Sequence, residues 1–182
     1  MPVKAFHQAK LRLAPALDAE DRAALARAMA TSVVQAGAPL PVSVVCDDSA
    51  VAEWAEEVGA EVLWTPGRGL DGAVAEGVDV LGERGVAQVI VAHADLPHAV
   101  ELAWVADGEG VTLVPDRRDD GTNVICVPTR SEFRFAYGAG SFARHRGEAE
   151  RLGLEVRIVR EPRLGWDVDV PADLVAPDWS GR

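Results

Sequence analysis

Long apolar runs are absent from this sequence, and cysteine is scarce. The longest apolar stretches are no longer than a β-strand, far short of the roughly 20 residues that span a bilayer. Polar residues interrupt the first dozen positions, which therefore lack the apolar core of a signal peptide. The two cysteines, Cys46 and Cys126, each lie in an apolar strand-like run, which favours buried, reduced thiols over a disulfide or a metal site. We therefore expect a cytoplasmic protein that does not bind membranes.

Basic residues are also in deficit. The net charge of −11 argues against nucleic acid as a partner, because nucleic-acid binding relies on a basic face. A nucleotide pocket needs only a few cations in one place, so a nucleotide ligand stays open. Only two of the 18 basic residues are lysines, Lys4 and Lys10, and both lie in the first ten positions. An ammonium group is a point charge suited to a phosphate oxygen, so this placement indicates a phosphate site, although chance could also produce it.

Several familiar catalytic signatures are missing. The sequence contains neither the GxxxxGK[ST] pattern of a P-loop nor the GxGxxG pattern of a dinucleotide site. Its four histidines follow no zinc-ligand spacing, and no nucleophile pattern of a serine or cysteine protease is present. These absences argue against a zinc enzyme, a P-loop NTPase and a dinucleotide-dependent enzyme.

The sequence does contain a regular alternation of strand-like and helix-like segments. Residues 42–46 form a β-branched run typical of a buried parallel strand, and residues 18–36 are predicted to form a helix that ends at Gly37. This alternation predicts an α/β fold with a mostly parallel sheet flanked by helices, in a single domain over residues 1–182. Ligands of such sheets bind beyond the carboxyl ends of the strands. The other predicted strands are 61–65, 88–92, 111–115, 123–127 and 154–159, and the other predicted helices are 51–58, 73–81, 96–106 and 141–152.

Three aspartates are candidate metal ligands. Asp95 follows the predicted strand 88–92, and Asp167 and Asp169 are two residues apart in an extended segment, so their side chains point the same way. Three converging carboxylates would hold a hard cation such as Mg²⁺, which binds carboxylate and phosphate oxygens. The alternative is that each aspartate caps the short helix that follows it.

Basic residues near the start and a glycine-rich loop are candidate nucleotide ligands. Lys4, Lys10 and Arg12 precede the first predicted helix, in a kind of loop that often cradles phosphates. Arg68 and Gly69 lie in the loop PGRGLDG, where the backbone can approach a ligand closely. The alternative is a solvated basic patch without a ligand.

A third candidate region surrounds Thr122 and the loop from Gly138 to Ser141. Ser141 begins a predicted helix, and backbone N–H groups at a helix N-terminus attract anions. With the Thr122 hydroxyl nearby, this region would bind the carboxylate or phosphate of a small acid. An ordinary loop that caps the helix is the alternative.

Taken together and in this order, these motifs resemble one family. It comprises the guanylyltransferases that act on 2-phospholactate or phosphoenolpyruvate in the biosynthesis of the deazaflavin coenzyme F(420). Any one motif is weak, but seven in register over nearly the whole chain are a strong signal. They are PVKAFHQAKLRLAP (2–15), DD (47–48), GRGLDGAV (67–74), ADLP (94–97), GTN (121–123), FAYGAGSFARH (135–145) and DVDVPADL (167–174).

The resemblance implies a Rossmann-like, GT-A-like nucleotidyltransferase fold, of the kind shared with molybdenum-cofactor guanylyltransferases and sugar-nucleotide synthases. It also implies GTP as the donor and Mg²⁺ as the cofactor. The implied roles are catalysis and triphosphate binding by Lys10, Arg12 and Asp95, nucleotide contacts from Lys4, Arg68, Gly69 and Asp71, acceptor contacts from Thr122, Gly138 and Ser141, and Mg²⁺ binding by Asp95, Asp167 and Asp169.

Two positions depart from the family's usual pattern. Asp71 stands where the family usually has asparagine, which affects a contact to the base or the ribose. Leu11 stands where the family usually has serine, which removes a hydroxyl contact to phosphate.

The implied reaction is substitution at the α-phosphorus of GTP by a phosphate oxygen of the acceptor, with loss of pyrophosphate. The nucleophile is already an anion at neutral pH, which agrees with the lack of a candidate general base of the His–Asp type. Alignment and charge neutralisation would supply the catalysis. The expected partners are GTP and a phosphorylated carboxylic acid. Phosphoenolpyruvate and 2-phospho-L-lactate both stay open as the acceptor, and a homodimer stays open as the assembly.

Two other functions compete with this one. The first is the same transfer to a molybdopterin or a sugar phosphate, for which the glycine-serine loop is less well suited. The second is a non-catalytic nucleotide-binding regulator, which would have no need for the complete set of three aspartates and Lys10.

Few residues precede the first candidate ligand. Only Met1, Pro2 and Val3 come before Lys4, too few for a central first strand of about five residues. We therefore expect the natural start of the protein to lie upstream of Met1.

Overall fold

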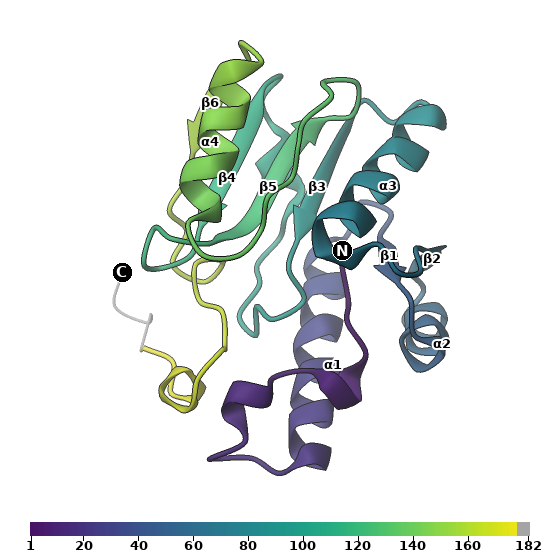
Figure 1. Ribbon diagram of the computed structural model, residues 1–182, viewed down its shortest axis with the longest axis vertical. Coiled ribbons are helices and arrows are strands. Elements are labelled where there is room, and N and C mark those ends of the chain that lie inside the picture. The colour runs from purple at the N-terminus through teal and green to yellow at the C-terminus, as the bar shows by residue number, and fades with distance from the viewer. Residues whose placement is uncertain (178–182) are drawn as a thin grey trace.

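The computed structural model describes residues 1–177, whose strands form two groups (Figure 1). In the smaller group, β1 (Ser43–Cys46) pairs in parallel with β2 (Glu61–Trp64). The larger group is a four-stranded sheet in the order β3-β5-β4-β6. Its strands are β3 (Gln88–Ala92), β4 (Val111–Pro115), β5 (Thr122–Pro128) and β6 (Val156–Ile158).

The α/β expectation is confirmed, with one strand reversed. β4 and β6 are parallel, but β5 runs antiparallel to both β3 and β4. The reversal follows from the short connection 116–121, because a tight turn joins antiparallel neighbours whereas a parallel pair needs a long crossover.

The first three residues extend the smaller group. Pro2 bridges Val45 in parallel, with the Val3 amide donating to the Val45 carbonyl and the Val45 amide to the Met1 carbonyl, both at 3.0 Å. A start upstream of Met1 stays a prediction.

The helices α1 and α4 match their predicted bounds within one residue, whereas α2 begins two residues and α3 four residues before the predicted start. The Asp18 carboxylate accepts from the Asp21 amide (2.9 Å) at the start of α1, and the Asp48 carboxylate accepts from the Val51 amide (3.1 Å) at the start of α2. Gly37 follows the last residue of α1. The helices are α1 (Ala19–Ala36), α2 (Ser49–Glu57), α3 (Gly69–Glu83) and α4 (Ser141–Arg151).

The predicted helix over residues 96–106 is wrong. Only the 3₁₀-helix η3 (Ala103–Ala106) forms in this stretch. The Leu102 amide donates to the Ala36 carbonyl at the end of α1 (2.9 Å), so this backbone group is satisfied by a tertiary contact in place of a helical one. The side chains of Leu96 and Leu102 are buried in one cluster with the end of α1.

β5 divides the core into two layers. Val124 and Cys126 pack in one cluster with the end of α1 and the 96–106 segment. Ile125 and Val127 pack in another cluster with α3 and α4, which cover the opposite face of the sheet (Figure 1). Side chains alternate between the faces of a strand, so burial on both faces explains the continuous apolar run of β5.

Both cysteines are buried and free, as predicted. Burial raises the pKa of the Cys126 thiol to about 11 and also raises the pKa of Cys46. Within residues 1–177, no helix has the length and apolar character needed to cross a membrane.

Candidate active site

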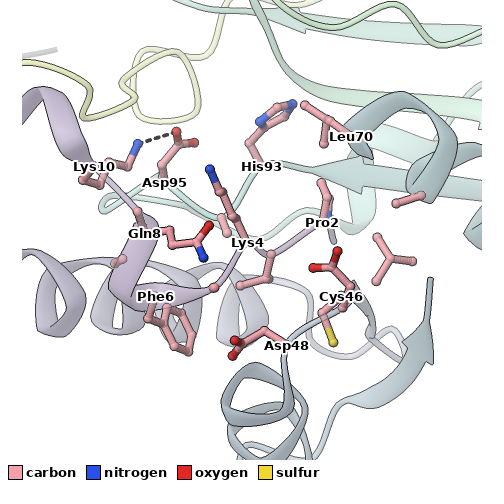
Figure 2. Close-up of a pocket in the computed structure, with 18 of the residues that line it drawn as sticks. Pro2, Lys4, Phe6, Gln8, Lys10, Cys46, Asp48, Leu70, His93 and Asp95 are labelled. Atoms are coloured by element: carbon pink, nitrogen blue, oxygen red, sulfur yellow. Dashed lines mark hydrogen bonds and ion pairs between the residues drawn. The ribbon is translucent and has the colours of Figure 1, made fainter. Parts of the chain in front are cut away.

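A cleft of about 1030 Å³ opens beyond the carboxyl ends of β1, β2 and β3 (Figure 2). The N-terminal segment, the start of α3 and the residues after β3 form its walls. The volume suits a nucleotide, since small-molecule sites occupy roughly 300–1,000 Å³. Of the predicted site residues, Lys4, Lys10, Arg12, Gly69, Asp95 and Asp169 line it.

Lys10 is held between two carboxylates. It lies between the 3₁₀-helices η1 (Phe6–Gln8) and η2 (Leu11–Leu13), in a left-handed conformation with φ of 55°. Its Nζ atom lies 2.7 Å from Asp95 Oδ2 and 3.1 Å from Asp169 Oδ1. Burial lowers the pKa of Lys10, but the two ion pairs outweigh burial, so the pKa is raised and the amine stays charged.

Asp95 has one oxygen paired and one oxygen free. Oδ2 accepts from Lys10, whereas Oδ1 is buried and has no hydrogen-bond partner among the described residues. Burial raises the pKa of Asp95, but the charge and hydrogen bond of Lys10, together with smaller contributions, outweigh burial and keep the pKa below its usual value. A buried anionic oxygen without a partner is costly, so Asp95 Oδ1 is suited to a cation.

Asp167 and Asp169 approach the same region from the C-terminal segment. Asp169 Oδ2 lies 3.7 Å from Arg12 Nη1, in addition to the pair with Lys10. Burial, followed by the negative charges of Asp95 and Asp169, raises the pKa of Asp167. The three carboxylates are therefore close enough to repel one another.

These carboxylates do not form a ready-made ligand cluster. Over residues 1–177, no group of three acidic, histidine or cysteine side chains is arranged to hold a metal ion. The Lys10 ammonium bridges Asp95 and Asp169. Binding of Mg²⁺ by the three aspartates stays a prediction, which the unpartnered Asp95 Oδ1 supports.

Arg117 orders the segment that carries Asp167 and Asp169. Its guanidinium donates to the Asp167 carbonyl (3.0 Å), pairs with the Asp173 carboxylate and lies 4.3 Å from the centre of the Trp166 ring. Asp173 Oδ2 in turn accepts from the Asp169 amide (2.8 Å). The chain from Trp166 to Asp173 is thereby folded around one arginine.

The glycine-rich loop divides between two environments. Gly69 adopts a φ of 64°, a conformation that favours glycine, and lines the cleft. Arg68 pairs with Glu76 (2.8 Å), and Asp71 accepts from the Tyr137 amide (2.8 Å). Asp71 thus ties α3 to the loop that precedes Ser141, and the nucleotide contacts of Arg68 and Asp71 stay predictions.

Thr122 and Ser141 come together around His145. Thr122 and Ser141 are 3% and 1% exposed, and Thr122 Oγ1 lies 3.0 Å from His145 Nδ1 and 3.5 Å from Ser141 Oγ. His145 Nε2 accepts from the Ala136 amide (3.0 Å), so Nδ1 carries the proton and donates to Thr122. Gly138 is exposed, has a φ of 94° and accepts from the Ser141 amide through its carbonyl (3.0 Å). An acceptor-binding role for Thr122, Gly138 and Ser141 stays a prediction.

Residues 1–176 match the family model described as guanylyl transferase CofC like. The chain belongs to this family.

Curated relatives in this family carry guanylyltransferase names. The phosphoenolpyruvate guanylyltransferase of Rubrobacter xylanophilus is 39% identical over 100% of this chain and 93% of its own length. That of Sphaerobacter thermophilus is 36% identical over 96% of this chain and 88% of its own length. The 2-phospho-L-lactate guanylyltransferase of Halorubrum lacusprofundi is 32% identical over 91% of this chain and 76% of its own length.

Solved structures agree on the nucleotidyltransferase fold. A protein from Desulfovibrio desulfuricans named as a nucleotide-diphospho-sugar transferase has a TM-score of 0.76 at 19% identity, covering 95% of this chain and 82% of its own. A cytidylyltransferase from Leptospira borgpetersenii has a TM-score of 0.62 at 11% identity, covering 95% of this chain and 81% of its own. At these identities the likeness shows the fold alone.

Sequence reasoning missed several residues of this CofC-like guanylyltransferase that the structure places at the cleft. Thr65 and His93 line it, and Thr65 Oγ1 and His93 Nε2 are buried without hydrogen-bond partners among the described residues. Burial lowers the pKa of His93, so its ring is neutral at neutral pH. His93 stands two residues before Asp95, at the end of β3, which was a positional signal for it. Thr65 directly follows β2 but belongs to no motif.

Proposed function

We propose that this protein transfers GMP from GTP to phosphoenolpyruvate or 2-phospho-L-lactate, with release of pyrophosphate, in coenzyme F(420) biosynthesis. The observation that carries the proposal is the cleft in which Lys10 is held between Asp95 and Asp169, in a chain of the CofC-like family. The guanylyltransferase names of the full-length relatives support the same donor and acceptors.

The basic residues of the cleft supply the triphosphate contacts. Lys10 carries a charge that two carboxylates stabilise, and the Arg12 side chain is 77% exposed, so it is free to approach a ligand. Lys4 lines the cleft, with its amino group directed into it (Figure 2). These cations bind the triphosphate and neutralise the charge that develops on the leaving pyrophosphate.

The acidic residues fit Mg²⁺. Asp95 Oδ1 has no partner among the described residues. Burial, and then repulsion from Asp95 and Asp169, raises the pKa of Asp167, so added positive charge here is favourable. Asp95, Asp167 and Asp169 would hold the ion. When bound, Mg²⁺ supplies orientation and charge neutralisation for the triphosphate.

The chemical step needs alignment more than proton transfer. A phosphate oxygen of the acceptor forms a bond to the α-phosphorus of GTP, and the bond from that phosphorus to the oxygen bridging to the β-phosphate breaks. The electron pair leaves with pyrophosphate, and the acceptor gains GMP through a new diphosphate linkage. The acceptor phosphate is already an anion at neutral pH, so the residues of the cleft bind and orient the two substrates.

The test is pyrophosphate release from GTP and Mg²⁺ in the presence of phosphoenolpyruvate or 2-phospho-L-lactate, with the product identified by its mass. We expect release with at least one acid and none without an acid. Asp95→Asn is the matched control, because the substitution keeps the size of the side chain and removes the charge. Tight GTP binding without release in the presence of either acid would contradict the proposal and favour a nucleotide-binding regulator. Release only with a sugar phosphate or only with molybdopterin would show that this compound, and neither of the two acids, is the acceptor.

A further inference from the structure

The two lysines that line the cleft gather at one end of it, beside Asp95 and Asp169, whereas the other end carries aspartates. Lys4 and Lys10 direct their amino groups toward the Asp95 end, whereas the Asp48 carboxylate lies on the other side of the cleft, beside Cys46 (Figure 2). Asp47 lines the cleft next to Asp48. A triphosphate bound by the lysines therefore places its nucleoside toward the end that the two aspartates occupy.

Two constraints hold the aspartate end in place. Asp48 Oδ1 accepts from the Val51 amide (3.1 Å) at the start of α2, which fixes the carboxylate and leaves Oδ2 for a ligand. The Thr65 amide donates to the Cys46 carbonyl (2.9 Å), which joins the ends of β1 and β2. Asp47 and Asp48 therefore follow the end of β1, and Thr65 follows the end of its paired strand β2.

Thr65 independently marks this end as a ligand site. Its side chain lines the cleft, is 4% exposed, and its Oγ1 has no hydrogen-bond partner among the described residues. A buried hydroxyl without a partner is costly, and a bound ligand that accepts or donates a hydrogen bond removes that cost.

The chemistry of these three side chains matches guanine. An ionised carboxylate only accepts hydrogen bonds, and a threonine hydroxyl both donates and accepts. Guanine presents two adjacent donors, N1–H and the 2-amino group, next to the O6 acceptor, whereas adenine presents an acceptor at N1. We propose that Asp47, Asp48 and Thr65 form the subsite that selects guanine, with the aspartates accepting from N1–H and the 2-amino group and Thr65 donating to O6. This inference rests on the proposed use of GTP.

The test compares the affinities of GTP, ITP, XTP and ATP for the full chain in Mg²⁺ by titration calorimetry, without an acceptor. Asp47→Asn and Asp48→Asn each replace acceptor-only oxygens by an amide that donates to the 2-oxo group of xanthine. We expect the wild type to bind GTP more tightly than ITP and ATP. In at least one variant, GTP affinity falls about 10- to 100-fold and the XTP-to-GTP affinity ratio rises. Thr65→Val lowers GTP affinity about tenfold.

Two controls separate base selection from loss of structure. Asparagine caps a helix as well as aspartate does, so Asp48→Asn keeps α2 intact, which thermal unfolding verifies. Asp107→Asn removes an exposed carboxylate outside the cleft lining and leaves all four affinities unchanged.

The outcomes distinguish this inference from the proposed function. Equal affinities for GTP and ATP in the wild type, or unchanged affinity ratios in both aspartate variants, overturn the guanine subsite even where GTP turnover is found. Shifted ratios without pyrophosphate release from any acceptor support the subsite and count against the proposed transfer.

Discussion

Lys10 and Asp95, 85 residues apart in the sequence, form an ion pair in which Nζ lies 2.7 Å from Oδ2. Both groups line the cleft, and the second oxygen of Asp95 is buried without a partner among the described residues. Arrival of a magnesium-bound triphosphate would offer each partner a new counter-charge, phosphate for Lys10 and metal for Asp95. The ion pair therefore keeps both charges ordered until the substrate binds.

Replacing Lys10 tests this arrangement. Lys10→Met removes the cation shared by Asp95 and Asp169, and we expect the rate of pyrophosphate release to fall by about 10²-fold or more. Lys10→Arg keeps the charge and is expected to retain more activity. Arg130→Met, at an exposed position outside the cleft lining, is the control for loss of a positive charge. Turnover of Lys10→Met within threefold of the wild type would remove Lys10 from the triphosphate site.

Asp167 is a predicted Mg²⁺ ligand whose charge also affects stability. Because Asp167→Asn removes a predicted Mg²⁺ ligand, we expect turnover to fall by about 10²-fold or more. Burial, and then Asp95 and Asp169, raise the pKa of Asp167, so its ionised form destabilises the folded state at neutral pH. Without ligands, thermal unfolding of the variant at pH 7 is therefore expected at the wild-type temperature or slightly above it. This difference is expected to vanish as the carboxyl becomes protonated at low pH. Near wild-type turnover of Asp167→Asn would contradict the prediction that Asp167 is a Mg²⁺ ligand.

Local sequence signals predicted most of the fold. Asp18 marks the start of α1 and Gly37 marks its end. Both could be recognised in the sequence because helix capping and termination depend on neighbouring residues. The run that forms β5 was recognisable because both of its faces are buried. The carboxyl ends of the strands also indicated the general position of the cleft, which Lys10, Asp95 and Asp169 line.

Long-range contacts account for what the sequence did not show. The 96–106 stretch does not become a helix because Leu102 bonds to the end of α1, a contact between segments distant in sequence. The Arg117–Asp173 pair spans 56 residues and belongs to no local pattern. Likewise, only the folded chain shows that Thr122 and Ser141 are buried against His145.

Arg117 is expected to position the C-terminal aspartates. Arg117→Met removes the contacts to Asp167 and Asp173, so the Mg²⁺ concentration for half-maximal activity should rise about tenfold, corresponding to the loss of a charged hydrogen bond. Arg118→Met is the matched control, because the Arg118 side chain is 54% exposed and its guanidinium lies 3.8 Å from the Asp173 carboxylate. A purely structural role for Arg117 would instead lower thermal stability and leave the Mg²⁺ requirement unchanged.

The loop before α4 tests the acceptor assignment. If Ser141 contacts the phosphorylated acid, Ser141→Ala raises the KM of the acid and leaves the KM of GTP nearly unchanged. A substitution at Gly138 is expected to be more harmful, because its φ of 94° disfavours side chains. Ser49→Ala, at an exposed position in α2, is the control. An equal rise in the KM of GTP for Ser141→Ala would move the loop to the nucleotide side.

His145 makes the stability of this protein depend on pH. Burial lowers its pKa from 6.5 to about 4, so between these values the unfolded chain binds a proton that the folded chain does not. The unfolding free energy therefore falls as pH falls through this window, by about 2 kcal/mol between pH 7 and pH 5. His145→Gln cannot titrate there, so the wild-type advantage in urea unfolding is expected to shrink by this amount from pH 7 to pH 5. His7→Gln, at an exposed histidine, provides the baseline. A pH-independent difference for His145→Gln would show that folding does not lower the pKa of His145.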